Sequence, residues 1–269
     1  MAATVVTITS GKGGVGKTTL VANLGVALAM LGRRVVVIDA DVGLRNLDVS
    51  LGLENRIVYD IVEVIEGRCR LRQAMVRDKR LSELFLIPAA QNRDKSAVKP
   101  DDMIRICDDL RDNHDFVLID SPAGIEEGFR YAVAPADRVL VVTNPEIAAV
   151  RDADRVIGLL EAAEMDSPGL VINRIRPEMV RRGEMLDIPD VVELLAIDLV
   201  GIVLEDPVIL ASTNRGHPAS LSRDGSKAAQ SFHDIAHRLC GEDVPFQAIS
   251  EPGMFGKLVR LMRMRGDGR

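Results

Sequence analysis

The chain has 269 residues, 47% of them hydrophobic, which suffices for one large domain with a well-filled core. Aromatic residues make up only 3% and the formal net charge is −6, which disfavours an aromatic-rich β-sandwich and a body wrapped broadly in nucleic acid. Three dispersed cysteines, Cys69, Cys107 and Cys240, show no CxxC spacing and argue against a disulfide or metal framework. No stretch approaches the roughly 20 apolar residues of a membrane span, and we expect no signal peptide, so any membrane contact should be peripheral.

Short apolar runs rich in Val and Ile alternate with helix-length segments along the chain. Strands are predicted at residues 4–9, 34–39, 84–88, 116–120, 138–143, 170–173 and 200–204. Helices are predicted at residues 18–31, 101–112, 147–163, 188–195 and 227–240. Because most of the strands are continuously apolar, the pattern predicts an α/β fold with a doubly wound, mostly parallel sheet flanked by helices. The domain should span residues 1–241, followed by a linker at 242–252 and a segment of different character at 253–269.

A glycine-rich loop lies between the first predicted strand and the first predicted helix. Gly11, Gly16, Lys17 and Thr18 match the pattern G-x-x-x-x-G-K-[ST] in the strand–loop–helix setting that it requires. Glycines let backbone N–H groups curl around phosphate oxygens, and the helix N-terminus adds partial positive charge. Lys17 would reach the β- and γ-phosphates, and the Thr18 hydroxyl would ligate Mg²⁺. The residues predicted to bind the nucleotide here are Gly11, Lys12, Gly13, Gly14, Val15, Gly16, Lys17, Thr18 and Thr19.

The same loop also fits a dinucleotide-binding pattern. Gly11, Gly13 and Gly16 spell G-x-G-x-x-G, and Asp39 ends the second predicted strand about where such a fold keeps its ribose-binding acid. A dinucleotide loop, however, has no use for a lysine followed by a threonine, because its backbone already holds the pyrophosphate. The sequence therefore favours a nucleoside-triphosphate site of the P-loop NTPase type.

Acidic residues follow two of the predicted strands. Asp120 ends the apolar run 116–119, and a carboxylate there is costly unless it is paired or coordinates a cation. We predict that Asp120 holds Mg²⁺ through water, with an N-cap for the next helix as the alternative. Asp39 and Asp41 follow the second strand, where the chain can turn both towards the nucleotide, although either could instead cap the following loop.

The last residues of the chain predict a basic amphipathic helix. At about 100° per residue, one arc is apolar and the opposite arc is basic without interspersed acids, except that the apolar Met264 falls on the basic side. The residues predicted to contact a membrane are Met254, Phe255, Leu258, Val259, Leu261 and Met262 on the apolar side and Lys257, Arg260 and Arg263 on the basic side. Such a helix lies in the headgroup boundary with its cations against anionic lipid. A last core helix with a charged outer face is the alternative.

Lys12, one residue after the first glycine, completes the pattern K-G-G-x-G-K-[ST]. This is the deviant Walker A signature, and the chain resembles the MinD branch of the MinD/ParA family of P-loop ATPases. The resemblance covers essentially the whole chain. It rests on the segments 39–48, 59–60, 121–124, 143–146 and 151–155. ParA-type proteins usually carry D-x-D-P-Q where this chain has Val42 and Gly43, and nitrogenase iron protein needs paired cysteines that this chain lacks.

The resemblance implies roles for individual residues. Lys12 would contact phosphate on a partner subunit, so hydrolysis of ATP would need a nucleotide-sandwich homodimer. Asp41 would orient the attacking water, making Lys12, Lys17 and Asp41 the catalytic set, while Asp39 would lie near the Mg²⁺ held by Thr18 and Asp120. Asn173 would contact adenine, and Asp206 lies in a second base-proximal loop, where relatives usually have Pro instead of Leu204.

The resemblance also implies a cellular function. An ATP-bound dimer with two weak tails would bind anionic lipid at the inner face of the cytoplasmic membrane and detach after hydrolysis. It would recruit a MinC-like division inhibitor and respond to a MinE-like factor that stimulates hydrolysis, with the helix at 147–163 as the partner surface. No specific nucleic acid is expected. The alternatives are a flagellar-number regulator resembling FlhG and a DNA-partition ATPase resembling ParA.

Overall fold

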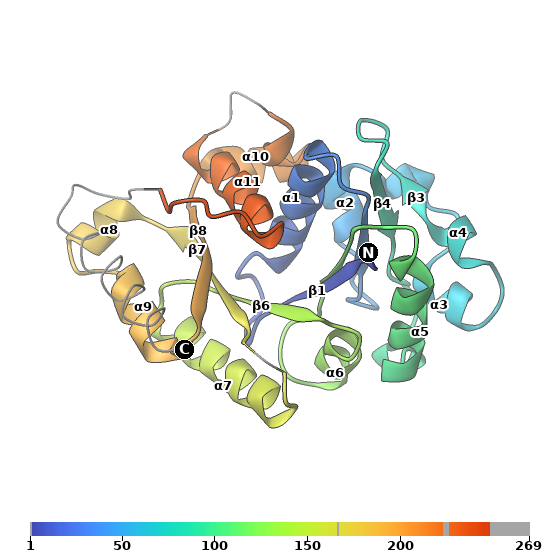
Figure 1. Ribbon diagram of the computed structural model, residues 1–269, viewed down its shortest axis with the longest axis horizontal. Coiled ribbons are helices and arrows are strands. Elements are labelled where there is room, and N and C mark those ends of the chain that lie inside the picture. Colours follow the sequence, from blue (N-terminus) through green and yellow to red (C-terminus); the bar gives the residue numbers. More distant parts are fainter. Residues whose placement is uncertain (1, 166, 223–225, 248–269) are drawn as a thin grey trace.

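Eight strands form one twisted sheet through the middle of the protein (Figure 1). The structure is a computed structural model that describes residues 2–165, 167–222 and 226–247. The strands are β1 (Thr4–Thr9), β2 (Val35–Asp39), β3 (Val76–Arg77), β4 (Leu84–Ile87), β5 (Phe116–Asp120), β6 (Arg138–Thr143), β7 (Gly169–Ile175) and β8 (Asp198–Leu204). Their order is β3-β4-β2-β5-β1-β6-β7-β8, and every pair is parallel except β3 with β4. The predicted doubly wound, mostly parallel sheet is confirmed.

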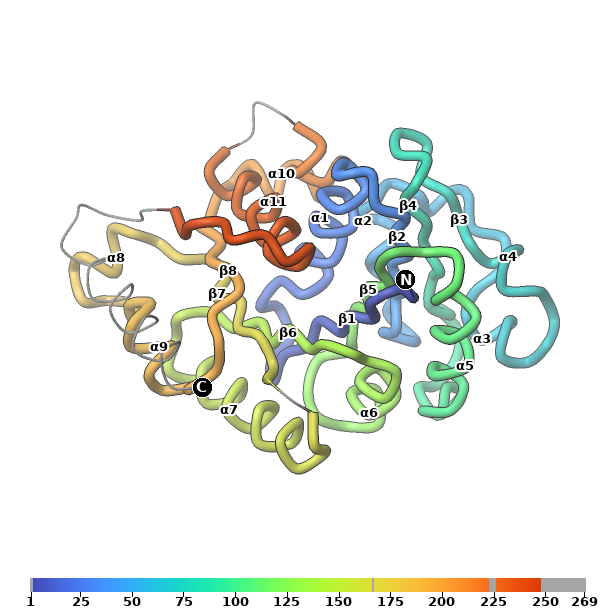
Figure 2. Tube along the Cα trace, in the orientation of Figure 1, coloured from blue at the N-terminus to red at the C-terminus, as the bar shows by residue number. Residues whose placement is uncertain are grey.

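Helices cover both faces of this sheet (Figures 1 and 2). They are α1 (Lys17–Met30), α2 (Leu47–Leu51), α3 (Ile61–Ile65), α4 (Leu71–Ala74), α5 (Pro100–Arg111), α6 (Glu127–Val133), α7 (Ile147–Ala162), α8 (Pro177–Arg181), α9 (Ile188–Leu195), α10 (Pro207–Asn214) and α11 (Lys227–Leu239). Three 3₁₀ turns, η1 (Glu54–Arg56), η2 (Lys95–Ala97) and η3 (Ala219–Leu221), complete the described elements.

Alternation along each strand divides the core between the two faces. Val35 and Val37 of β2 pack with α1 and α11, whereas Val36 and Ile38 pack on the other face with α3, α5 and α6. A third apolar cluster joins β6 and β7 to α7 and α9. Successive side chains of a strand point to opposite faces, so a strand covered on both faces must be apolar at every position. This explains the continuous apolar runs in the sequence.

Sequence patterns identified the long elements and missed the short ones. The long helices and most strands begin and end within a residue or two of the predicted bounds, but β7 continues beyond the predicted end at 173 to Ile175, with register shifts against β8. The two-residue edge strand β3 and the short helices α2, α3, α4 and α8 were not predicted, and neither were α6 and α10, which have 7 and 8 residues. Elements of two to five residues contain too little of a repeat to show a period.

The last described helix, α11, ends one residue before the predicted end at 240. Gly241 has a φ of 86° and its N–H bonds back to the carbonyl of Arg238, while the next N–H reaches His237, which is a glycine-terminated C-cap. The first residues of the predicted linker then lie against the body, because Arg238 donates to the carbonyl of Val244 and its guanidinium lies 4.0 Å from the ring centre of Phe246. The predicted amphipathic segment 253–269 lies outside the described residues.

Within the described ranges, no helix combines the length and the apolar character that crossing a membrane requires.

Candidate functional site

The carboxyl ends of β1, β2 and β5 bring the predicted phosphate loop and the predicted carboxylates together. Strand register places Asp39 directly beside Asp120, and β1, which leads into the loop, pairs with β5 up to that same residue. In Figure 2 the loop leaves β1 near the middle of the molecule and passes directly into α1. Parallel sheets bind ligands at this edge, where the order of strands reverses on either side of β1.

Two glycines of the loop stand where no other residue fits. Gly16, the N-cap of α1, has a φ of 101°, and a Cβ there would lie 2.3 Å from Nδ2 of Asn173. A Cβ on Gly11 would lie 2.1 Å from the backbone oxygen of Asp152 in α7. The loop is therefore packed between α7 on one side and the end of β7 on the other, which fixes its path.

The two lysines of the loop lie in different surroundings. Lys17 is buried, and its Nζ donates to Ser10 Oγ at 2.9 Å. Burial lowers the pKa of Lys17, while the charges of Asp120 and Asp41 act in the opposite direction. Lys12, in contrast, is exposed on the outer side of the loop. Lys17 faces the carboxylates of its own chain, and Lys12 is free to reach another molecule.

Asp39 anchors the segment that follows β2. Its Oδ1 accepts from the N–H of Asp41 at 3.0 Å, and its Oδ2 accepts from the N–H groups of Asn46 and Leu47 at 3.0 Å each. The side chain is almost completely buried, and this burial raises its pKa to about 6 in spite of the three N–H donors. Both oxygens are engaged by backbone, so Asp39 fixes the start of α2.

Asp120 is the most strongly perturbed acid of the site. Burial, followed by the charge of Asp39, raises its pKa to about 8, and a hydrogen bond from the Thr18 side chain acts in the opposite direction. Its Oδ1 is buried and accepts no hydrogen bond within the described residues. A carboxylate oxygen left in this state is costly unless a cation or water satisfies it.

The Thr18 hydroxyl and the unpaired oxygen of Asp120 fit a Mg²⁺ ion. No group of three or more His, Cys, Asp or Glu side chains within the described residues forms a ready cage for a metal. Mg²⁺ usually keeps several waters and binds through one or two carboxylates together with substrate phosphates. Asp39 fits less well as a direct ligand, because backbone donors already occupy both of its oxygens.

Asp41 is the more exposed neighbour of the buried acids Asp39 and Asp120. Its Oδ1 is buried and accepts no hydrogen bond within the described residues, but Lys95 Nζ lies 3.4 Å away. Lys95 comes from the 3₁₀ turn η2, far away in the sequence, and sequence patterns gave no sign of it. Ser10, the partner of Lys17, was also missed, although its place directly before Gly11 could have suggested it.

Asn173 joins the end of β7 to the phosphate loop. Its Nδ2 donates to the carbonyl of Val15 at 2.7 Å, and its Oδ1 accepts from the N–H of Arg174. Arg174 has a φ of 57°, a left-handed conformation that is uncommon outside glycine. An Asn amide has two donor hydrogens and two acceptor lone pairs, so both atoms keep capacity for a base edge.

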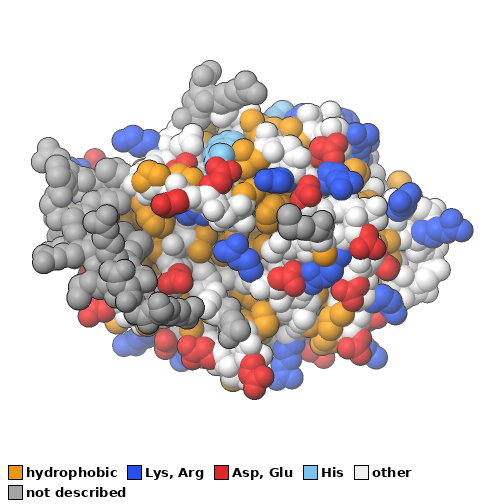
Figure 3. Space-filling view, viewed as in Figure 1, with side chains coloured by type: hydrophobic (Ala, Val, Ile, Leu, Met, Phe, Trp, Pro, Cys, Tyr) orange, Lys and Arg blue, Asp and Glu red, His pale blue; other side chains and the backbone are white. Residues whose placement is uncertain are grey.

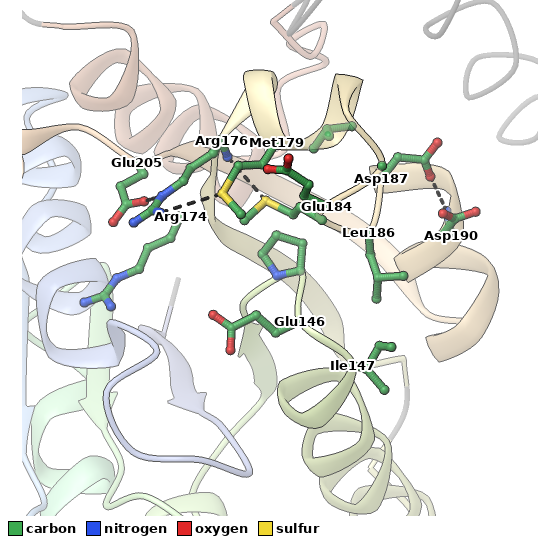
Figure 4. A pocket seen from close by; sticks show the side chains of 14 residues that line it. Glu146, Ile147, Arg174, Arg176, Met179, Glu184, Leu186, Asp187, Asp190 and Glu205 are labelled. Carbon is green, nitrogen blue, oxygen red and sulfur yellow. Dashed lines mark hydrogen bonds and ion pairs between the residues drawn. The ribbon is translucent and has the colours of Figure 1, made fainter.

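A pocket of about 790 Å³ opens between the ends of β7 and β8 and the helices α7, α8 and α9, and Arg174, the residue after Asn173, is part of its lining (Figure 4). Figure 4 shows Arg176 between Glu205 and Met179, with which it forms an ion pair and a hydrogen bond respectively, while Glu146 comes from the opposite side. Asp206, the residue after Glu205, uses Oδ1 to accept from the N–H of Val208 and so caps α10. Its side chain therefore has a structural partner in the loop where base contact was predicted.

Comparisons with known proteins agree with this geometry. A family model described as the CobQ/CobB/MinD/ParA nucleotide binding domain matches residues 6–219. The chain is 50% identical over 264 residues to the septum site-determining protein MinD of Bacillus subtilis, covering 97% of this chain and 98% of that protein. Among solved structures, MinD in the MinC:MinD cell division protein complex of Aquifex aeolicus is similar, with 49% identity, a TM-score of 0.85 and coverage of 91% and 99%. MinD of Pyrococcus horikoshii, complexed with Mg-ADP, shows 30% identity, a TM-score of 0.80 and coverage of 88% and 96%.

A phosphate loop at the switch point of a mostly parallel sheet, with a buried lysine and buried acids around it, defines a P-loop nucleotide-binding protein. Within that class, the match to the family model and the 50% identity over nearly the whole chain identify the family of this protein. The chain belongs to the MinD septum site-determining proteins of the CobQ/CobB/MinD/ParA family.

Proposed function

We propose that the chain is a Mg²⁺-dependent ATPase that switches between a membrane-bound dimer and a free monomer, and so recruits a division inhibitor to the membrane. The observation that carries the proposal is the pair of loop lysines, one buried against the carboxylates of its own chain and one exposed. Two subunits facing each other across their phosphate loops would then supply two cations to each triphosphate.

The proposed reaction converts ATP and water into ADP and phosphate. Lys17 would neutralise charge on the β- and γ-phosphates, and Lys12 of the second subunit would do the same from outside, as an arginine finger does. Asp41 would orient the attacking water. Thr18 and, through water, Asp120 would hold Mg²⁺, which would offset the charge of the phosphates.

Asn173 and the loop at Asp206 are proposed to recognise adenine. Asn173 donates to the carbonyl of Val15 in the phosphate loop, and the next residue, Arg174, lines the pocket between the ends of β7 and β8, which supports this proposal. The relative from Pyrococcus horikoshii is complexed with Mg-ADP, which supports an adenine nucleotide as the ligand of this chain.

Membrane binding is proposed to reside in the segment 253–269. Each basic residue near an anionic leaflet contributes about 1 kcal/mol, and the apolar side of this segment is short, so one tail should bind weakly. Two tails held in one dimer make the second insertion intramolecular, which raises avidity by roughly 10²–10⁴. Hydrolysis would separate the subunits and release both.

The partners are proposed by similarity. The relative from Aquifex aeolicus forms a complex with MinC, which supports a MinC-like inhibitor as partner here, and a MinE-like factor would stimulate hydrolysis. The exposed face of α7, which includes Ile147 and Leu159, is the proposed docking surface.

Co-sedimentation with anionic vesicles tests the proposal. The full chain should sediment with vesicles in Mg-ATP and remain in solution in Mg-ADP or without nucleotide. Lys12→Ala, which removes the exposed cation, and a deletion of residues 253–269 should each abolish the ATP-dependent fraction. Equal binding in ATP and ADP, or ATP-dependent retention on DNA without lipid binding, would refute the membrane switch.

A further inference from the structure

Lys95 is the basic side chain that lies nearest to Asp41, and the ATPase mechanism outlined above gives it no role. Its Nζ lies 3.4 Å from Asp41 Oδ1, with the two side chains 38% and 21% exposed. The same Oδ1 is buried and accepts no hydrogen bond from any residue that the structure describes. An oxygen removed from water and left without a donor depends on the nearest charge for its stability.

The turn that carries Lys95 is fixed on both sides. Asp94 caps η2 by accepting from the N–H of Ser96 at 3.0 Å. Just before it, Arg93 donates to both oxygens of Glu66 at 2.8 Å each, which ties the turn to the end of α3. Lys95 is therefore presented from a short, anchored turn rather than from a long loop.

The same stretch of chain also holds the segment that carries Asp41. The N–H of Gly43 donates to the carbonyl of Ala90 at 2.8 Å, and a Cβ on Gly43 would lie 3.5 Å from the carbonyl oxygen of Arg93. Gly43 has a φ of 96°, so the chain turns sharply just after Asp41 and passes against this stretch. Asp41 and Lys95 thus sit on two segments that are connected by backbone contact.

Charge around Asp41 is dominated by acids. Asp39 and Asp120 lie at the ends of neighbouring strands, and the charges of Asp41 and Asp39 both act on Asp120. Lys17 and Lys95 are the cations of this group, and they are close enough to influence each other electrostatically. Lys17 faces Ser10 and the phosphate loop, so Lys95 is left as the counter-ion on the outer side of Asp41.

We propose that Lys95 is a positioning residue that aims Asp41 at the attacking water. The inference rests on the proposed ATPase function. The pair is longer than a charge-assisted hydrogen bond of about 2.7–2.9 Å, so it fixes the direction of one oxygen without saturating the carboxylate. The second oxygen accepts no hydrogen bond from the described residues and is free to accept from water. Without Lys95, repulsion from Asp39 turns Asp41 outwards.

The effect on turnover is moderate, because a partly exposed ion pair is a weak one. Lys95→Ala is expected to lower kcat for ATP about fivefold, which corresponds to about 1 kcal/mol. The affinity for ADP should stay within about twofold, since Lys95 acts through Asp41 and not on the diphosphate. Lys95→Arg keeps the charge and should recover most of the lost rate.

The experiment is a double-mutant cycle on the full chain with Mg-ATP and anionic vesicles. Lys95→Ala, Asp41→Asn and the double variant are compared with the wild type, and Lys99→Ala, an exposed lysine four residues further on, is the matched control. If Lys95 acts through Asp41, its removal costs nothing further in the Asp41→Asn background.

Three outcomes would overturn the inference: an unchanged or raised kcat in Lys95→Ala, an equal loss in both backgrounds, or an equal loss in Lys99→Ala. A wild type whose hydrolysis of ATP does not exceed that of Lys17→Ala would instead remove the proposed ATPase function, and with it the role of Lys95. The two failures are distinguishable, because the role of Lys95 is tested only by comparing Lys95→Ala with a wild type that hydrolyses ATP faster than Lys17→Ala does.

Discussion

Asp120→Asn is expected to stabilise the nucleotide-free protein near neutral pH while it weakens Mg²⁺-dependent function. The wild-type carboxyl is buried next to Asp39, and one of its oxygens accepts no hydrogen bond among the described residues. Burial raises the pKa of Asp120 from its ordinary value of 3.8 to about 8. The folded chain therefore holds a proton that the unfolded chain has already released above about pH 4. Folding takes up this proton, so the free energy of unfolding falls as the pH rises from about 4 towards 8.

The size of the effect follows from proton linkage. One proton contributes at most about 1.4 kcal/mol per pH unit, so between pH 5.5 and 7.5 the wild type loses up to about 3 kcal/mol. For a domain of this size each kcal/mol moves Tm by roughly 2–4 °C, which gives a loss of roughly 6–12 °C at most. An asparagine amide binds no proton in this range and can still accept from the Thr18 hydroxyl, so the variant should lack this contribution.

The measurement is the Tm of thermal unfolding in EDTA at pH 5.5 and at pH 7.5. It compares the wild type with Asp120→Asn and with the exposed control Asp112→Asn. The control should follow the wild type. At pH 7.5 Asp120→Asn should unfold at a higher temperature than the wild type, and the gap should shrink at pH 5.5. Parallel pH profiles for all three proteins would refute the account of Asp120 as a buried acid that waits for a cation.

Three further predictions concern packing around the site. Gly16→Ala should cost about 1–3 kcal/mol and abolish nucleotide binding, measured by calorimetry, because the left-handed φ of 101° and the nearby Asn173 amide leave no place for a Cβ. Asn173→Ala should cost about 1 kcal/mol in urea unfolding by leaving the carbonyl of Val15 without its donor. Arg238→Ala should speed proteolytic cleavage within residues 242–247, since the guanidinium holds both the backbone and the Phe246 ring of that segment.

Much of the fold was predictable because its signals are local. The strands β1, β5 and β6 were predicted with their correct bounds, as each is a continuous apolar run closed by a polar residue or a turn. The phosphate loop is also local, since Gly11 to Thr18 form one uninterrupted stretch whose chemistry requires that spacing. Their meeting with Asp39 and Asp120 followed from the rule that parallel strands end at one edge.

What could not be predicted depends on contacts between distant segments. Lys95 reaches Asp41 only because Arg93 is tied to Glu66 and the neighbouring backbone to Gly43, and no sequence period records such an arrangement. The same holds for Asn173, whose donation to the loop depends on the strand order that places β7 close to β1. Polar residues at loop and strand-end positions such as these look like ordinary solvated residues until the fold is known.

One face of the molecule is mixed in charge. In Figure 3, basic and acidic side chains are interspersed over the visible face, without a broad single-sign field. A surface of this kind offers little for wide, non-specific attachment of a polyanion to that face.

The packing of α7 against the phosphate loop gives the proposed stimulating partner a short physical route to the chemistry. A Cβ on Gly11 would overlap the backbone oxygen and the Cβ of Asp152, so loop and helix are in close contact at this point. Elsewhere along its length α7 exposes Ile147 and Leu159, at 63% and 39%, as apolar contacts for a docked protein. Close-packed interiors transmit small shifts rather than damping them. A partner that moves α7 by a few tenths of an ångström therefore moves Gly11 directly, and with it Lys12, the next residue and the one proposed to complete the active site of the other subunit.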